Sequence, residues 1–545
     1  MIIRTVVFIT FLLVSSTVYG AEKVDIILQN GVIFTSEEKA PLYSAIAIKG
    51  DIILAVGGSE IMDHYTASKV IDLKGRLLIP GFNDAHLHIE GQPAHFFSIT
   101  KFKSIKEILA ALKERVKTLE PGEWITGYSW SEDELAEKRR IFRKDLDSVT
   151  PNNPVILTRA GSHSAVANSM ALAIAGLDEN TPQPEKGMFE KDADGNLNGI
   201  IRELDALVYK HAPVGTPEDM INSMEATLRD RLTFGITSLT DAWTEPFVYE
   251  KYWKTIYARS GDSLPRATVQ IHPKLRDIGL DESLKLFKGF KGKTGDGNKH
   301  LKVGALKVFV DGGFTGPAAW TIAPYKSDPD YYGTYAVKMD DFYKLGKIAH
   351  DNGWQMGIHA IGDRAITEAV DAIARILDEN PRADHRHYLN HFTVMPSAET
   401  MDKMAKYKIA ITQQPNFAYT LEGRYATHLG GENLQHNNSV RTPMTFGIPV
   451  ALSSDDLPVG PMVGIYTAVT RKGMSGTVYG KEEAITVAEA IRAYTAVGAW
   501  INHDDDIKGT LTKGKLADMA ILSQNILTID PEKILSTKVD MTIVG

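Results

Sequence analysis

The stretch Gly81-Phe-Asn-Asp-Ala-His-Leu-His88 begins the part of the chain that decides the fold. Residues 83–88 within it are the first of eight segments that predict short strands. The other segments are residues 235–241, 267–271, 305–310, 355–359, 387–391, 409–413 and 450–454. Helical patterns such as residues 364–377 and 398–406 separate several of them. Eight strands that alternate with helices predict an α/β fold, a closed (β/α)8 barrel of the TIM type, with an open doubly wound sheet as the alternative.

A large insertion follows the first strand, because residues 89–234 are too many for one crossover. It contains a predicted helix at residues 104–116, opened by the capping box Ser104-Ile-Lys-Glu107, and an apolar strand at residues 154–157. A second capping box, Thr486-Val-Ala-Glu489, opens a final helix. Material inserted after a barrel strand is expected above the carboxyl-terminal face, where it can wall a pocket.

The two ends of the chain predict a small β module. Residues 24–34 run through Asn30-Gly31, and residues 45–56 turn through Lys49-Gly50-Asp51, which predicts two short hairpins. Residues 509–522 and 539–544 have the same character, so both ends are expected to share one sheet. We therefore assign residues 21–80 and 501–545 to a β-sandwich, and residues 81–500 to the barrel with its insertion.

Composition limits the classes of protein and of partner. A chain of 545 residues with 43% hydrophobic and 23% charged residues is an ordinary folded protein, large enough for a barrel with additions. The net charge of −8 comes without a basic tract, so neither nucleic acid nor an anionic membrane surface is expected as a partner. Because cysteine is absent, there are no disulfides, and any metal ion must be held by nitrogen and oxygen atoms. A homo-oligomer remains open.

The first 20 residues are predicted to be a signal peptide. Arg4 supplies the positive end, residues 5–16 are apolar, and Val18-Tyr19-Gly20 precedes Ala21 as a cleavage site. An uncleaved membrane anchor is the alternative, but the apolar run is shorter than the roughly 20 residues that a spanning helix needs. Export without disulfides favours a bacterial periplasm, or secretion, with no stable membrane insertion after cleavage.

Histidines lie at the carboxyl ends of several predicted strands. His86 and His88 are two residues apart, which puts both imidazoles on one face of the first strand. Taken alone, such a pair is as consistent with structural histidines as with metal ligands. His359, His391 and Asp455 end the fifth, sixth and eighth predicted strands. Barrel enzymes keep their catalytic groups at this end, so the pattern favours a metal site over packing.

Lys307 lies in the almost wholly apolar segment Val303-Gly-Ala-Leu-Lys-Val-Phe-Val310. A buried ammonium must be paired, deprotonated or modified, because an unpaired buried charge is costly. The residues leave two interpretations open. Lys307 forms an ion pair, for which Asp311 is nearby in sequence, or it is a neutral amine that has combined with carbon dioxide to give a carbamate.

This set of motifs resembles the amidohydrolase superfamily, and within it the amidohydrolase-3 group of YtcJ-like and N-substituted formamide deformylase-like proteins. The likeness covers nearly the whole mature chain. Besides Ile79-Pro-Gly-Phe-Asn-Asp-Ala-His-Leu-His88 it rests on Thr158-Arg-Ala-Gly-Ser-His-Ser-Ala-Val-Ala-Asn168, Leu306-Lys-Val-Phe-Val-Asp-Gly312, His359-Ala-Ile-Gly-Asp363, His391, Ser454-Asp455 and residues 509–518.

The resemblance implies a barrel beside a β-sandwich, and a binuclear centre. In it His86 and His88 bind the more buried metal, carboxylated Lys307 bridges two metals, His359 and His391 bind the second, and Asp455 contacts the first. Zinc is the usual ion of the family, although these ligands also suit manganese, iron or cobalt. Two departures concern the substrate pocket. Asn390 stands where the group usually has Glu, and Ser454-Asp-Asp-Leu-Pro458 is one residue longer than the commoner motif.

The expected reaction is hydrolysis of a non-peptide C–N bond in a small-molecule substrate. Asp455 would act as general acid and base. The matched motif suggests that His163 donates to the developing oxyanion, and a hydrogen bond that anchors its loop is the alternative. The weaker substrate candidates are Tyr128 and Trp130 as an apolar wall, and Asp363 and Asp456 as polar contacts. Capping of the adjacent helices is the alternative for both carboxylates, and it is favoured for Asp363. The alternatives are a one-metal deaminase without Lys307 as ligand, an esterase, lactonase or phosphoesterase on the same centre, and a periplasmic small-molecule binding protein.

Overall fold

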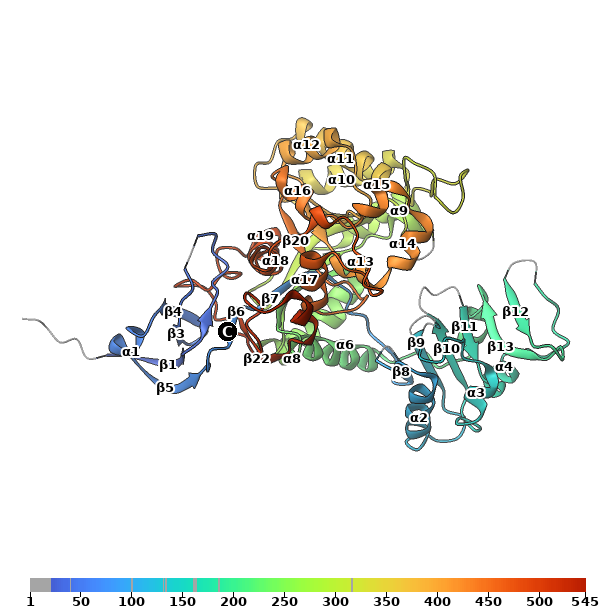
Figure 1. Cartoon of the computed structure of the whole chain (residues 1–545). Helices are drawn as coiled ribbons and strands as arrows, with labels where there is room; N and C mark the ends of the chain where they lie inside the picture. The colour runs from blue at the N-terminus through green and yellow to red at the C-terminus, as the bar shows by residue number, and fades with distance from the viewer. Residues whose placement is uncertain are drawn as a thin grey trace, which may run out of the picture.

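The computed structural model describes residues 21–39, 41–99, 101–130, 132, 135–159, 164–184, 187–314 and 317–545. The signal peptide predicted over residues 1–20, and also His163, therefore lie outside the described residues. Figure 1 shows a β-sheet of the amino-terminal region at one end of the molecule, a barrel in the middle and a further sheet at the opposite end. Within these ranges, no helix has the length and apolar character needed to cross a membrane.

The barrel consists of the strands that the sequence predicts, joined in parallel in chain order. They are β7 (Phe82–Leu87), β14 (Ile236–Thr244), β15 (Arg266–Ile271), β16 (Leu301–Phe309), β17 (Met356–Ala360), β18 (Tyr388–His391), β19 (Ala410–Gln413) and β20 (Val450–Leu452). The Asp455 N–H donates to the His86 carbonyl oxygen at 2.9 Å and so links the end of the last strand to the first. The (β/α)8 prediction is confirmed, and the open-sheet alternative is wrong.

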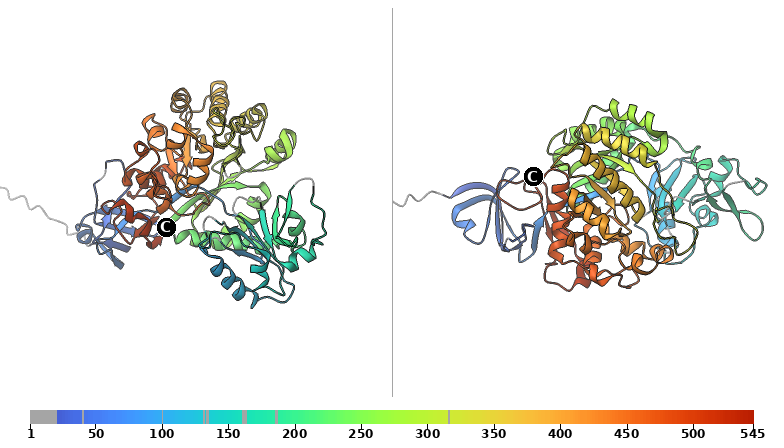
Figure 2. Two further views of the ribbon diagram at one scale, coloured as in Figure 1. Left: turned by 45° about the vertical axis from the view of Figure 1, so that its right-hand side comes forward. Right: turned by 90° about the horizontal axis from the view of Figure 1, so that it is seen from above.

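Helices surround the barrel strands (Figure 2). The longer ones are α6 (Pro217–Leu232), α9 (Leu275–Gly289), α10 (Met339–Asp351), α11 (Asp363–Glu379), α12 (Ala398–Tyr407), α17 (Pro461–Thr470) and α18 (Val487–Tyr494). Shorter ones are α7 (Pro246–Val248), α8 (Lys254–Ser260), α13 (Pro415–Thr420), α14 (Glu422–His428), α15 (Gly431–Gln435), α16 (Arg441–Thr445) and α19 (Ala496–Ile501). In α11 the buried residues Ile366, Val370 and Ile373 recur every three or four positions, which gives the apolar stripe that docks on the barrel. The capping box of Thr486 and Glu489 on α18 is present as predicted.

The insertion between β7 and β14 has its own sheet and core, at the right of Figure 1. Its elements are β8 (Phe96–Ser98), α2 (Ile105–Val116), β9 (Ile125–Trp130), α3 (Arg143–Asp147), β10 (Val155–Arg159), β11 (Ser164–Ala167), α4 (Ser169–Ile174), β12 (Met188–Lys191), β13 (Leu197–Arg202) and α5 (Ala206–Tyr209). Ser104 caps α2 by accepting the Glu107 N–H at 3.1 Å. The other half of the predicted capping box, in which the Glu107 carboxylate accepts the Ser104 N–H, is wrong. That carboxylate accepts the N–H of the preceding residue, Lys103.

The terminal segments form two four-stranded sheets. One contains β1 (Glu22–Gln29), β3 (Ala45–Lys49), β4 (Ile52–Gly57) and β5 (Tyr65–Asp72); the other contains β2 (Val32–Ile33), β6 (Leu77–Pro80), β21 (Met519–Leu522) and β22 (Val539–Ile543). The second sheet joins both ends of the chain, as expected, and the hairpin through Gly50 is confirmed. The prediction of a hairpin at Asn30-Gly31 is wrong. Because β3 and β5 occupy both edges of β1, the chain passes there into the other sheet.

Candidate metal centre

The side chains predicted as ligands converge at the carboxyl ends of the barrel strands. His86 is the penultimate residue of β7 and His88 directly follows that strand. Lys307 lies on β16, His359 on β17, His391 ends β18, and Asp455 follows β20. Because parallel strands place their carboxyl ends at one mouth of a barrel, residues far apart in sequence meet there. The positive φ of 52° at Asp455 and of 79° at His391 marks the point where each strand turns away.

Asp455 is the point of contact for three of the histidines. Its Oδ1 lies 3.5 Å from His88 Nε2, and its Oδ2 lies 3.6 Å from His86 Nε2 and 3.9 Å from His391 Nδ1. One potential ligand atom from each of His86, His391 and Asp455 lies within 4.8 Å of the others. This spacing fits one cation between them, since nitrogen and oxygen ligands bind such ions at about 2.0–2.2 Å.

His359 and Lys307 extend the cluster on its other side. The ring centroid of His391 lies 4.5 Å from that of His359 and 4.7 Å from that of His86. The Lys307 side chain is 1% exposed, and its charge acts on His86, His359, His391 and Asp455. The structure therefore brings all six predicted ligands together. Their role in binding metal stays a prediction.

Hydrogen bonds fix the orientation of two imidazoles. His86 Nδ1 is 2.8 Å from Asn390 Oδ1, which also accepts the Thr412 hydroxyl at 2.8 Å, so the proton is on Nδ1 of His86. His86 Nε2 is then a lone-pair donor, buried and without a hydrogen-bond partner. His391 Nδ1 is likewise 2.8 Å from Gln414 Oε1. A buried imidazole nitrogen that faces a carboxylate and two further histidines fits a divalent cation.

Burial governs the charge state of these groups. It lowers the pKa of His86, His359 and His391 well below the ordinary value of 6.5, and the Lys307 charge adds to this effect. It also lowers the pKa of Lys307 to about 7 and raises that of Asp455 to about 6, the latter against the opposing charge of Lys307. Near neutral pH the imidazoles are therefore neutral, which is the form that binds metal.

The ion pair considered for Lys307 with Asp311 does not form in the described part of the chain. Asp311 instead accepts backbone N–H groups from Trp320 at 2.9 Å, Ile361 at 3.0 Å and Gly362 at 2.9 Å. This carboxylate thereby ties the loop after β16 to the end of β17, two residues beyond His359. Sequence proximity to Lys307 had suggested the wrong partner, because the strand end turns Asp311 toward the neighbouring loop.

Residues 69–545 match the amidohydrolase family. The chain belongs to that family. It is 29% identical to the putative amidohydrolase YtcJ of Bacillus subtilis over 95% of this chain and 98% of the relative. It is 26% identical to the N-substituted formamide deformylase of Arthrobacter pascens, over 92% and 94% of the two chains. In fold it is similar to an uncharacterized metal-dependent hydrolase of Pyrococcus horikoshii, with a TM-score of 0.70 and 24% identity over 93% and 99% of the two chains.

The substrate residues predicted for this amidohydrolase are not brought together as the ligands are. Trp130 is 2% exposed and its Nε1 donates to the Leu157 carbonyl oxygen at 3.0 Å, so its ring lies in the core of the insertion and not in a pocket wall. Tyr128 is 41% exposed. The capping role favoured for Asp363 is wrong, because the N-cap of α11 is Gly362 and Asp363 is the first residue of the helix. Its carboxylate instead accepts the Ile322 N–H at 2.9 Å. Asp456 is exposed beside Asp455, and its contact with substrate stays a prediction.

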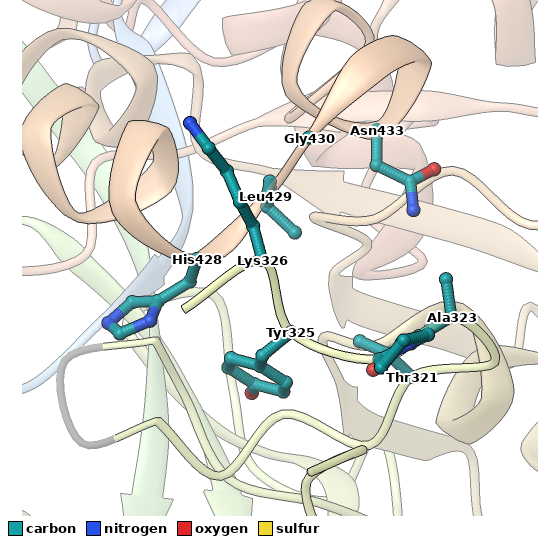
Figure 3. Close-up of a pocket in the computed structure, with 9 residues that line it drawn as sticks. Thr321, Ala323, Tyr325, Lys326, His428, Leu429, Gly430 and Asn433 are labelled. Carbon is teal, nitrogen blue, oxygen red and sulfur yellow. The ribbon is translucent and has the colours of Figure 1, made fainter. Parts of the chain in front are cut away.

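A cavity of about 240 Å³ lies between the loop after β16 and the end of α14 (Figure 3). Tyr325, Lys326, His428 and Asn433 are among its lining residues, and none of the six ligand candidates is. The two basic side chains of this lining already have hydrogen-bond partners. Lys326 Nζ donates to the Ala426 carbonyl oxygen, and His428 Nδ1 shares a hydrogen bond with the Ser327 hydroxyl. The cavity is thus separate from the candidate centre.

His272 is a strand-end residue of the amidohydrolase barrel that the sequence interpretation missed. It directly follows β15, is 1% exposed, and its Nδ1 lies 3.4 Å from the Lys307 carbonyl oxygen. The rule that selected His359 and His391 also applies to Gln270-Ile-His272, because this histidine comes at the end of the third predicted strand. Applying that rule to every strand would have found it.

Proposed function

We propose that this amidohydrolase hydrolyses a carbon–nitrogen bond other than a peptide bond, such as an amide, an N-formyl or N-acyl amine, or a cyclic amide. The proposal includes a divalent metal centre, with two zinc ions bridged by carboxylated Lys307. The observation that carries it is the buried, unpartnered Nε2 of His86 beside His391 and Asp455. The named activity of the deformylase relative supports the choice of bond.

Lys307 supports the bridged form of the centre. It has no ion-pair partner within 4.0 Å in the described residues, and burial lowers its pKa to about 7, so a substantial part of the amine is neutral at neutral pH. A neutral amine can combine with carbon dioxide to give a carbamate and one proton. The carbamate replaces a buried cation by an anion with two oxygen ligands, which suits a site of neutral imidazoles.

The mechanism assigns separate tasks to the residues of the chain. When bound, the metal ions supply Lewis acidity and lower the pKa of water. Asp455 accepts the proton from the attacking water and returns it to the leaving nitrogen. The side-chain oxygen of Asn390 accepts from Nδ1 of His86, and that of Gln414 accepts from Nδ1 of His391. These hydrogen bonds fix the tautomer and the orientation of each imidazole ring. His163 is the proposed hydrogen-bond donor to the oxyanion that develops on the attacked carbonyl group.

The test is metal analysis, followed by a zinc- or manganese-supplemented screen of N-acyl amines, formamides, N-acyl amino acids, cyclic amides and lactones. We expect about two metal ions per chain and turnover of at least one amide. Matched esters and amidines are added to the screen as comparison compounds. Turnover of esters or lactones alone would replace the proposal by an esterase, and turnover of amidines with one metal and an unmodified Lys307 would replace it by a deaminase. Full metal content without turnover of any compound would favour a binding protein.

We also propose that the chain is exported. The basic and apolar pattern of residues 1–20 supports this, with cleavage before Ala21. Amino-terminal sequencing of the protein from a bacterial periplasmic fraction should begin at Ala21. Recovery of Met1 in the cytoplasmic fraction alone would contradict it.

A further inference from the structure

Four side chains form a cluster beside Lys307. Three lie at the ends of β14, β15 and β16, and the fourth lies at the start of α9. We call this cluster the aromatic–arginine subsite, and it consists of Trp243, His272, Arg276 and Phe309. The Trp243 ring centroid lies 5.3 Å from those of both His272 and Phe309. The Arg276 guanidinium carbon lies 5.8 Å from the Trp243 centroid and 5.2 Å from the Phe309 centroid.

The subsite adjoins the candidate metal centre. The Phe309 centroid is 4.7 Å from Lys307 Nζ and 4.8 Å from the His359 ring centroid. A molecule whose reacting group lies on the metal ligands therefore has this cluster within reach of its remaining part.

Two of its members are open to solvent. Trp243 is 38% exposed, although large aromatic side chains at a barrel mouth gain stability by burial, and the Arg276 side chain is 42% exposed. Asp277 accepts from Nε of Arg276 at 3.0 Å. The two terminal amino groups of Arg276 donate to no protein acceptor in the described residues, and they are the edge that binds a carboxylate with two parallel hydrogen bonds.

His272 supplies an independent sign that a polar group is missing. Its Nε2 is buried and lacks a hydrogen-bond partner, and the nearest carboxylate oxygen, of Asp277, is 4.0 Å away. Buried polar atoms without partners are few in native proteins and often belong to binding sites. The Asp277 carboxylate thus lies near both the unpaired imidazole of His272 and the exposed guanidinium of Arg276.

We propose that the aromatic–arginine subsite selects N-acylated aromatic amino acids, with the aromatic ring against Trp243 and the carboxylate on Arg276. The inference rests on the proposed function and names its substrate class. For N-formylphenylalanine, water adds to the formyl carbon, the C–N bond breaks, and the proton goes to the leaving nitrogen, giving formate and phenylalanine. An N-acylated aromatic amino acid would contact both exposed side chains of the subsite, Trp243 through its ring and Arg276 through its carboxylate.

Three matched compounds separate the two contacts. N-formylphenethylamine lacks only the carboxylate of N-formylphenylalanine, and N-formylalanine lacks only the ring. Binding to the zinc-loaded protein is measured by calorimetry, and turnover is measured alongside. We expect the wild type to prefer N-formylphenylalanine over each comparison compound by about 10-fold or more, the size of one charge-assisted hydrogen bond or one aromatic contact.

Variants assign each preference to its residue. Arg276→Gln should remove the preference for the carboxylate and keep that for the ring, whereas Trp243→Ala should do the reverse. Arg375→Gln is the matched control. Arg375 lies on the outer helix α11, its guanidinium carbon is 3.9 Å from the ring centroid of Tyr343 on α10, and it takes no part in the candidate centre. It should keep both preferences.

The outcomes distinguish this inference from the proposed function. Equal binding of the three compounds by the wild type, or a carboxylate preference that survives in Arg276→Gln, overturns the inference even when amides are hydrolysed. Selective binding without turnover of any amide retains the subsite and overturns the proposed function instead.

Discussion

His86 and Asn390, 304 residues apart in sequence, share a buried hydrogen bond of 2.8 Å between Nδ1 and Oδ1. Asn390→Leu should weaken zinc binding by about 10- to 100-fold, because the His86 ring loses the acceptor that fixes its tautomer. Asn390→Asp should retain most of the affinity, since its carboxylate also accepts. Competition with a chelator measures the affinity, and equal affinities for Asn390→Leu and the wild type would show that the contact does not orient the ligand.

Lys307→Met and His391→Ala should each lower the metal content and abolish hydrolysis, because each removes a proposed ligand of the proposed centre. His64→Ala is the control, since His64 ends the short helix α1 (Ile61–His64) beside the terminal sheet. Elemental analysis of the purified variants and turnover of the best amide provide the measurements. Full metal content and activity in both variants would rule out the binuclear centre.

Three buried histidines at the opposite end of β18 should make stability fall in acid. His387 Nδ1 accepts the Met356 N–H at 3.0 Å and its Nε2 lies 2.8 Å from His350 Nδ1, while the His387 N–H donates to His385 Nδ1. Burial lowers the pKa of all three, that of His385 to about 4. Each nitrogen that accepts a hydrogen bond must stay unprotonated, so the folded chain holds these rings neutral.

The sign of this pH effect follows from the lowered pKa values. Below about pH 6.5 the unfolded chain binds protons that the folded chain does not, so stability should fall by up to about 1.4 kcal/mol per pH unit for each histidine. For His385 the fall should level off near pH 4. The urea midpoint between pH 7.5 and 4 measures it. His385→Gln should show a shallower slope, and an unchanged slope would contradict the assignment.

Gly362→Ala should disturb the loop after β16. A Cβ at this position would lie 2.0 Å from the Trp320 carbonyl oxygen, so the backbone that Asp311 holds would have to move. We expect a loss of about 1–3 kcal/mol and lower turnover, since His359 is three residues away. Gly423→Ala is the control, because nothing lies within 4 Å of its Cβ. Thermal unfolding compares the two, and equal melting temperatures would refute the close contact.

The sequence by itself determined the barrel and the positions of its candidate metal ligands. Strands and helices follow from the local spacing of apolar residues, and the capping box at Thr486 needs only residues three apart. His86, His359 and His391 could be selected because the carboxyl end of a parallel strand is recognisable along the chain. The same local rule covers His272, which lies at an equivalent position.

Only the tertiary structure decided which groups meet. The Asn30-Gly31 turn has the sequence of a hairpin, yet β1 and β2 lie in different sheets because other strands occupy both edges of β1. Asp311 is four residues from Lys307 but bonds to the backbone of two distant segments. Trp130 is buried in the insertion. Such partners depend on strand register and loop packing across hundreds of residues, whereas periodicity and capping depend on immediate neighbours.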